Sequence, residues 1–212
     1  MKSMKYFMMG ALLFGCSLGT MAQDGTPADV EAARNLVKNK PADYEKQMKN
    51  FIKANKKNAD NLVAIGRALF EEGDTAQAAA FANQALSIKK FSFAPAYILL
   101  GDIASQMDNG GAAASNYEQA IFANPKDPEP YRKYAIVYSR ISPEGATQKL
   151  EELRNERPDY PVDALIGNIN YNVQRYSTAI EAYSKVPLDK MERIDYINYA
   201  RALQLGRKFE TT

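Results

Sequence analysis

Apolar residues recur along the chain with the spacing of amphipathic α-helices. Leu62, Ile65 and Leu69 follow the i, i+3, i+7 pattern that places side chains on one face of a helix. The same spacing, or its i, i+4, i+7 variant, recurs in three more segments: Ala78, Ala82 and Ala85; Ala113, Tyr117 and Ala120; Tyr131, Tyr134 and Tyr138. The pattern predicts an all-α fold.

Small residues recur at two linked positions. The first set is spaced by 35, 34, 32 and 33 residues: Gly66, Gly101, Ala135, Gly167 and Ala200. A second small residue follows the first four after 12, 12, 11 and 12 residues: Ala78, Ala113, Ala146 and Ala179. Two antiparallel helices approach closely where one of them presents Gly or Ala to the other. Each unit is therefore predicted to be a helix, a turn and a second helix.

Turn formers lie between the two small positions of each unit. They are Glu72-Gly73-Asp74, Asp108-Asn109-Gly110-Gly111, Ser142-Pro143 and the less typical Gln174-Arg175. Pro125 and Pro158 are expected to stop the second helices of their units, because proline cannot continue the helical hydrogen-bond ladder.

These residues resemble the tetratricopeptide repeat (TPR), a helix-turn-helix unit of about 34 residues. The segment 94–127 matches best, through Tyr97, Leu100, Gly101, Ala113, Tyr117, Ala120 and Pro125. The fourth unit offers Ile166, Gly167, Ala179 and Tyr183. Two features depart from the pattern: the third unit is one residue short in its turn, and Asp163 and Asn170 occupy positions where the family carries large apolar side chains.

The resemblance implies an α-α superhelix, a right-handed solenoid of antiparallel helix pairs. We expect a leader over 1–22, a helical cap or degenerate repeat over 23–58, and the TPR array over 59–212. Its units are about 59–93, 94–127, 128–159 and 160–192, with an incomplete unit over 193–212. Gly206–Glu210 is expected to begin a turn and a second helix. No polar capping element follows, which predicts a longer array or a last helix that docks elsewhere.

The first 22 residues have the layout of a secretory signal peptide. Lys2 and Lys5 precede an apolar run over 6–15, and Thr20-Met21-Ala22 supplies small residues for cleavage. The apolar run is shorter than the roughly 20 residues that span a bilayer, and no later segment resembles a transmembrane helix. The protein is expected to be exported and periplasmic or outer-membrane-associated in a bacterium, or secreted.

Cys16 is the one cysteine of the sequence and has two interpretations. Leu13-Phe14-Gly15-Cys16 loosely resembles a bacterial lipobox, which would make Cys16 a lipid anchor. Alternatively, Cys16 is removed with the leader. The second interpretation is preferred, because the bulky Phe14 stands where that motif usually carries a small residue.

Charge and residue types narrow the classes of function. Of 27 basic residues two lie in the leader, which leaves 25 against 25 acidic residues, so nucleic acid is not an expected partner. The sequence contains no His, which excludes Ser-His and Cys-His catalytic systems and zinc sites built on those ligands. Asp127, Asp159 and Asp163 lack calcium-loop spacing and are interpreted as helix caps. We expect no enzyme activity, no cofactor and no metal.

The family resemblance implies which side chains face the concave side of the array. Carried over to this sequence, they are Val63, Arg67 and Phe70; Ile98 and Asp102; Arg132 and Ile136; Asn168, Tyr171 and Asn172; and Arg201. Arg and Asn pair with peptide backbone or carboxylates, and Tyr and Phe supply apolar contact area. The Lys/Asn/Arg clamp with which some TPR proteins hold chaperone C-termini is not reproduced, since Asp102 and Ile136 occupy two of its positions.

Three functions remain open at this stage. The leading hypothesis is a non-catalytic protein- or peptide-binding adaptor of the cell envelope. A glycan-binding or nutrient-uptake component of the outer membrane is the alternative, although Trp platforms are missing. The third is a glycan-cleaving enzyme that uses paired carboxylates such as Glu71-Glu72 or Glu151-Glu152, which are better interpreted as solvated helix ends and faces.

Overall fold

The computed structural model describes residues 27–210, in which the chain forms α-helices and one short 3-10 helix and no strand. The helices are α1 (Pro27–Asn39), α2 (Tyr44–Ala54), α3 (Ala59–Glu71), α4 (Thr75–Ile88), α5 (Ala94–Gln106), α6 (Gly110–Ala123), α7 (Pro128–Tyr138), α8 (Pro143–Glu156), α9 (Val162–Asn172), α10 (Tyr176–Ser184), η1 (Leu188–Lys190) and α11 (Arg193–Glu210). The all-α fold expected from the sequence is confirmed.

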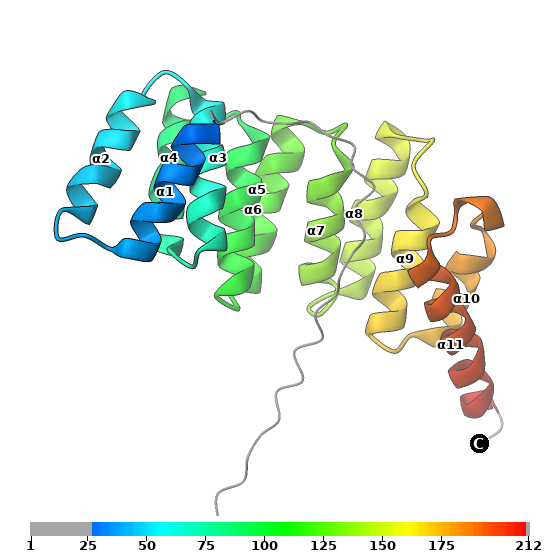
Figure 1. The fold of residues 1–212 in the computed structure, drawn as a ribbon. Helices are drawn as coiled ribbons and strands as arrows, with labels where there is room; N and C mark the ends of the chain where they lie inside the picture. Colours follow the sequence, from blue (N-terminus) through cyan, green and yellow to red (C-terminus); the bar gives the residue numbers. More distant parts are fainter. Residues whose placement is uncertain (1–26, 211–212) are drawn as a thin grey trace, which may run out of the picture.

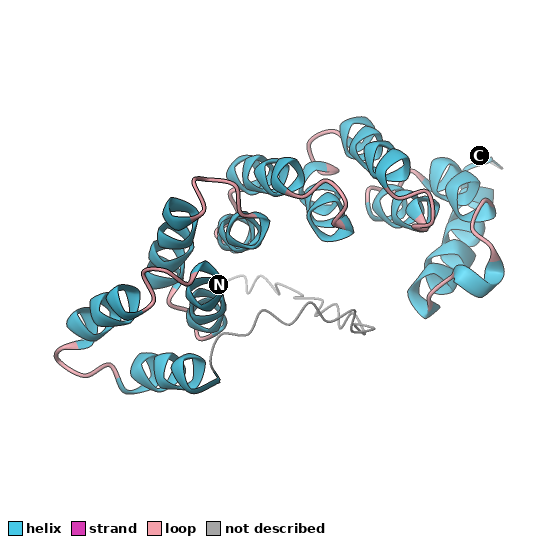
Figure 2. Cartoon of the chain, turned by 90° about the horizontal axis from the view of Figure 1, so that it is seen from above, coloured by secondary structure: helices cyan, strands magenta, loops and turns pink. Residues whose placement is uncertain are grey.

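Consecutive helices pack as pairs, and the pairs stack side by side (Figure 1). Seen from above, the stack curves into an arch (Figure 2). Across neighbouring pairs, α1 contacts α3, α3 contacts α5, α7 contacts α9, and α9 contacts α11. In a curved double layer the helices of successive pairs approach most closely on the inner side. The odd-numbered helices therefore form the inner layer, and we call the surface that they present the inner face.

Glycine permits the closest helix-helix contacts. A Cβ atom on Gly101 would lie 2.4 Å from the Tyr117 ring, and one on Gly167 would lie 2.6 Å from the Tyr183 ring. Real Cβ atoms do not approach other heavy atoms so closely. At Gly101 and Gly167 the recurring small residue thus accommodates an aromatic ring from the second helix of its own pair, whereas at Gly66 the nearest side chain is Leu99 of the next pair, at 3.0 Å.

The helix ends follow capping rules. Asn58, Asp74, Asn109 and Ser142 each accept a hydrogen bond from the backbone N–H three residues later, over 3.0, 3.0, 3.1 and 3.0 Å. Asp127 caps α7 through the Glu129 N–H at 3.0 Å, which confirms its interpretation as a cap. The same interpretation is wrong for Asp163, which is the second residue of α9. The helices before Pro125 and Pro158 end at Ala123 and Glu156.

The turns inside three of the pairs share one backbone conformation. Gly73, Asp108 and Gln174 occupy the same position of the turn, with φ of 89°, 59° and 63°. This left-handed conformation ends a helix at little cost for Gly and at a higher cost for other residues. The connection between α7 and α8, residues 139–142, is one residue longer than the other three and contains no positive φ. The expectation of a shorter turn in the third unit is therefore wrong: the unit is short because α7 ends three residues after Ala135, whereas α5 ends five residues after Gly101.

The sequence expectations about two sets of glycines near helix ends are also wrong. Gly110 and Gly111 are the first residues of α6 and do not belong to the turn. Gly206 does not start a turn either, because α11 continues through it to Glu210. A Cβ on Gly206 would lie 3.1 Å from Ile180 Cδ1, so this glycine serves helix packing against α10.

Three residues depart from the repeat pattern, and the structure shows the environment of each. Asp163 pairs with Arg154 at 2.8 Å, and the buried Asn170 donates to the Ile166 carbonyl at 2.9 Å. Ala200, aligned with Gly167 in the sequence, is exposed because no second helix covers that side of α11 in the described chain.

The expected leader, with Cys16, lies outside the residues that the structure describes. Between residues 27 and 210, no helix combines the length and the apolar character needed to cross a membrane.

Candidate peptide-binding surface

Asp102 connects four helices on the inner face. Its Oδ1 accepts hydrogen bonds from Lys133 Nζ of α7 at 2.7 Å and from the Tyr117 hydroxyl of α6 at 2.9 Å. Its Oδ2 lies 3.2 Å from a guanidinium nitrogen of Arg67 on α3. Only 10% of the Asp102 side chain is exposed, whereas 40% of the Arg67 side chain remains exposed. Arg67, Asp102 and Lys133 thus form a charged row across α3, α5 and α7.

Asn168 forms the equivalent network two units farther along. Its Oδ1 accepts hydrogen bonds from the Tyr183 hydroxyl and from Asn198 Nδ2, each at 2.7 Å. Its Nδ2 donates to Asp195 Oδ1 at 2.6 Å. Asp102 and Asn168 therefore play the same part, each accepting from a tyrosine 15 residues later and from the next odd-numbered helix.

The two tyrosines are held neutral by their surroundings. Burial raises the pKa of the Tyr117 phenol, and the negative charge of Asp102 raises it further. Burial also raises the pKa of Tyr183, and the Asn198 hydrogen bond opposes this shift. Both hydroxyls therefore act as donors to Asp102 and Asn168 at physiological pH.

The structure distributes the predicted inner-face residues over three environments. Val63 and Ile98 are buried, so they pack inside the array and present almost no surface to a ligand. Six others are partly buried: Arg67, Phe70, Asp102, Arg132, Asn168 and Tyr171. Ile136, Asn172 and Arg201 are exposed and are the accessible members of the set. Val63 and Ile98 depart from the expectation because inner helices also pack against their neighbours.

Sequence reasoning missed the partners that hold these side chains in place. Lys133, Asn198 and Asp195 were not expected on this surface, although they form the networks of Asp102 and Asn168. One sequence signal could have indicated these networks: Tyr117 and Tyr183 each stand 15 residues after an Asp or Asn. Opposite charges one unit apart at Arg67 and Asp102 were a second signal.

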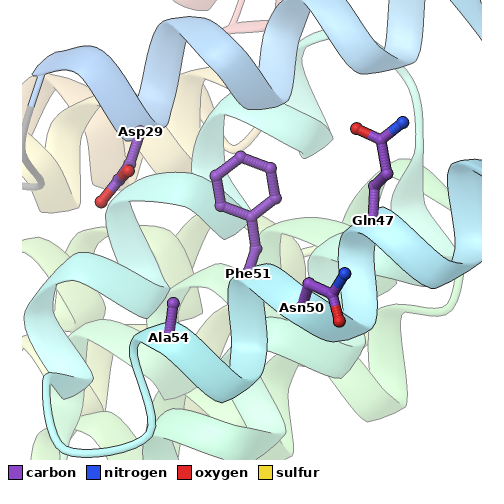
Figure 3. Close-up of a pocket in the computed structure, with 5 residues that line it drawn as sticks. All are labelled: Asp29, Gln47, Asn50, Phe51 and Ala54. Atoms are coloured by element: carbon purple, nitrogen blue, oxygen red, sulfur yellow. The ribbon is translucent and has the colours of Figure 1, made fainter.

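A separate hollow lies between α1 and α2 at the N-terminal end of the array. It has a volume of about 270 Å³ and is lined by Asp29, Gln47, Asn50, Phe51 and Ala54. Figure 3 shows Asp29 on α1 opposite the Phe51 ring, with the remaining residues along α2. We call this hollow the α1–α2 slot.

The family model of the tetratricopeptide repeat matches residues 59–91 and 94–127, which contain α3 to α6. The chain contains tetratricopeptide repeats. No curated protein sequence matches it significantly.

Solved structures show the same TPR fold at low sequence identity. A tetratricopeptide repeat protein from Parabacteroides merdae has a TM-score of 0.62 at 14% identity, covering 85% of this chain and 73% of its own. YrrB, a TPR protein described as having an unusual peptide-binding site, has a TM-score of 0.56 at 14% identity over 86% and 93% of the two chains. A thermophilic TPR protein of Thermus thermophilus has a TM-score of 0.55 at 16% identity over 84% and 98%.

The carboxylates considered for catalysis are engaged in ion pairs of the TPR array. Glu71 and Glu72 both bind Arg34, the latter at 3.0 Å. Glu151 pairs with Arg154 at 2.6 Å, and Glu152 pairs with Lys149 at 2.8 Å. These contacts give each carboxylate a structural role. TPR proteins are in general non-catalytic scaffolds.

The aspartates considered for calcium are likewise occupied by protein groups. Asp159 accepts from Arg157, and this contact lowers the pKa of the Asp159 carboxyl. Burial raises the pKa of Asp127. Between residues 27 and 210 there is no group of three or more Cys, Asp or Glu side chains that would hold a metal ion.

Proposed function

We propose that this TPR protein is a non-catalytic scaffold of the bacterial cell envelope that binds a protein or peptide segment on its inner face. The envelope assignment rests on the leader pattern of residues 1–22. The binding assignment rests on the inner face itself, and YrrB, with its peptide-binding site, supports a peptide as the ligand.

The observation that carries the proposal is the charged row of Arg67, Asp102 and Lys133. Ion pairs across three successive helix pairs fix these side chains before any ligand arrives. Ordering them in advance lowers the entropy cost of binding. Arg67 donates one N–H to Asp102, and its exposed guanidinium keeps further donors for peptide carbonyl or carboxylate groups.

Apolar and polar groups next to this row extend the surface toward the C-terminus. Ile136 follows Lys133 on α7 and is 41% exposed, which supplies apolar contact area. Asn172 and Arg201 are exposed on α9 and α11. An extended segment that lies across the inner face from α3 to α11 would meet cationic, apolar, amide and again cationic groups in that order.

The test is affinity capture from an envelope extract with paired variants. Ile136→Glu introduces a charge on the inner layer, and Phe122→Glu introduces the same charge on α6 of the outer layer, where Phe122 is 85% exposed. We expect a partner captured by the native chain to be retained by Phe122→Glu and to be lost by about tenfold or more with Ile136→Glu. Equal loss or equal retention with both variants would contradict binding on the inner face.

A glycan array run with the same three proteins separates the alternative function. A nutrient-uptake role predicts sugar binding that changes tyrosine fluorescence, because no Trp is present. A peptide-binding scaffold predicts no glycan signal above that of an unrelated helical protein.

A further inference from the structure

The N-terminal helix pair carries a concentration of positive charge that the neutral total of the chain conceals. Residues 38–57 contain seven lysines and only two acidic residues, Asp43 and Glu45. Residues 58–210, by contrast, carry 17 basic and 20 acidic side chains. The seven lysines are all exposed: Lys38, Lys40, Lys46, Lys49, Lys53, Lys56 and Lys57.

Most of these lysines have no acidic partner in the described chain. Lys38 lies 3.6 Å from Glu72, and the other six form no ion pair with the side chains described between residues 28 and 206. Asp43 and Glu45 accept hydrogen bonds from Gln47 and Gln77 and offset two of the seven charges, so residues 38–57 keep an excess of five positive charges. Uncompensated cations raise the local concentration of anionic partners.

Two of these lysines share a face of α2 with one residue of the α1–α2 slot. Lys46, Asn50 and Lys53 follow the i, i+4, i+7 spacing and so share one face of α2. Asn50 belongs to the slot lining, so the two lysines flank its edge. The slot lining also includes the apolar side chains of Phe51 and Ala54 (Figure 3).

The size and chemistry of the slot fit one side chain and its backbone. Its volume of about 270 Å³ is below the range of about 300–1,000 Å³ that is usual for small-molecule pockets. Asn50 has an exposed amide that can pair with a peptide backbone. Asp29 accepts one hydrogen bond from Asn61 at 2.9 Å, and a carboxylate can accept a further one from a backbone N–H.

We propose that the α1–α2 slot is a second binding site, which takes an apolar side chain from a peptide segment whose flanking residues are acidic. The site is separate from the inner face and does not depend on the function proposed for it. A peptide fits the observations better than an anionic membrane surface. Membrane-surface segments place large apolar side chains beside their lysines, and in the described chain the exposed large apolar residues all lie at Phe91 or beyond.

The test uses fluorescence anisotropy with a short labelled peptide in which one Phe stands between two runs of Glu. Ala54→Tyr places a large side chain at the slot from an exposed position. The double variant Lys46→Glu, Lys53→Glu reverses the sign of the charge beside the slot. We expect the native chain to bind, each of these variants to weaken binding by about tenfold, and high salt to weaken it further. The matched control is Lys126→Glu with Lys190→Glu, two exposed lysines elsewhere, and binding should remain within about twofold.

Three results would overturn the proposal. The first is no binding of the peptide to the native chain, with circular dichroism showing it folded. The second is unchanged binding to Ala54→Tyr, or to a peptide with Ser in place of Phe, which would show charge attraction without use of the slot. The third is co-sedimentation with phosphatidylglycerol vesicles that Lys46 and Lys53 control while the peptide does not bind. Ile136→Glu should leave peptide binding at the slot unchanged, so the two proposals can fail separately.

Discussion

The Tyr117 hydroxyl donates to Asp102 Oδ1 over 2.9 Å, and the Tyr117 ring fills the space left by the missing side chain of Gly101. One tyrosine therefore joins the packing of a helix pair to the polar row on the inner face. Tyr183 repeats the arrangement with Gly167 and Asn168 at 2.7 Å. The small-residue repeat and the candidate binding surface are thus parts of one structural unit.

The Gly101–Tyr117 contact predicts the effect of one added methyl group. In Gly101→Ala the new Cβ would lie 2.4 Å from the Tyr117 ring, so the two helices must separate or the ring must move. We expect a loss of about 1–3 kcal/mol in the free energy of unfolding, measured by urea denaturation. Gly111→Ala is the control, because its Cβ would meet nothing closer than 4.0 Å and should leave stability unchanged or raised. Similar losses in both variants would contradict the packing argument.

Removal of the Asp102 carboxylate should destabilise more than the loss of an exposed charge. Asp102→Ala leaves the Tyr117 hydroxyl, on a residue that is 2% exposed, without its acceptor. We expect a loss of about 1–3 kcal/mol in urea denaturation, and a smaller loss for Asp102→Asn, which keeps an acceptor oxygen. Glu156→Ala, at the exposed end of α8, is the control and should change stability by less than about 0.5 kcal/mol. If Asp102→Ala behaves like this control, the hydrogen bonds of Asp102 do not stabilise the array.

Asn170 offers a stabilising substitution. Its side chain is buried, and its Oδ1 is the one buried side-chain polar atom of the described residues that has no hydrogen-bond partner. Asn170→Leu removes that unpaired acceptor and restores the apolar side chain typical of the position. We expect a gain of about 1 kcal/mol in the free energy of unfolding. Asn172→Leu, exposed on the same helix, should give no comparable gain, and a destabilised Asn170→Leu would refute the explanation.

The buried tyrosines predict sensitivity to alkaline pH. Burial raises the pKa of Tyr134 to about 12 and also raises the pKa of Tyr117 and Tyr183 above their ordinary value of 10.0. A group whose pKa is higher in the folded state stabilises the fold fully below its unfolded pKa. This contribution is lost as pH rises through the folded value. The denaturation midpoint should therefore be steady from pH 8 to about 10 and fall above it. A midpoint that rises above pH 10 would show the opposite sign.

The repeat could be predicted from the sequence because its close helix contacts require small residues at regular intervals. Gly66, Gly101 and Gly167 mark close helix contacts directly, since no other residue leaves that space. The prediction at Gly206 was wrong because a glycine near a helix end usually indicates a turn. Here Gly206 lies inside α11 and permits close packing against Ile180 of α10. The sequence alone cannot distinguish these two uses, because the neighbouring Ile180 lies 26 residues away.

The binding surfaces could be predicted only in part. The alignment of units placed Asp102 and Asn168 on one face, but their contacts with Lys133 and Asn198 depend on how adjacent pairs stack. The α1–α2 slot depends on the looser packing of the first pair, which no residue pattern specifies. The charge concentration at 38–57 was present in the sequence and was hidden by the balanced total.

Site-specific photo-cross-linking tests the central claim most directly. A benzoylphenylalanine is placed at Ile136 on the inner layer or at Phe122 on the outer layer, and the protein is irradiated in cells that carry this gene. The account predicts a discrete cross-linked partner from position 136 and none from position 122, because the inner face is the surface that a partner occupies. A partner cross-linked from position 122 and absent from position 136 would contradict it.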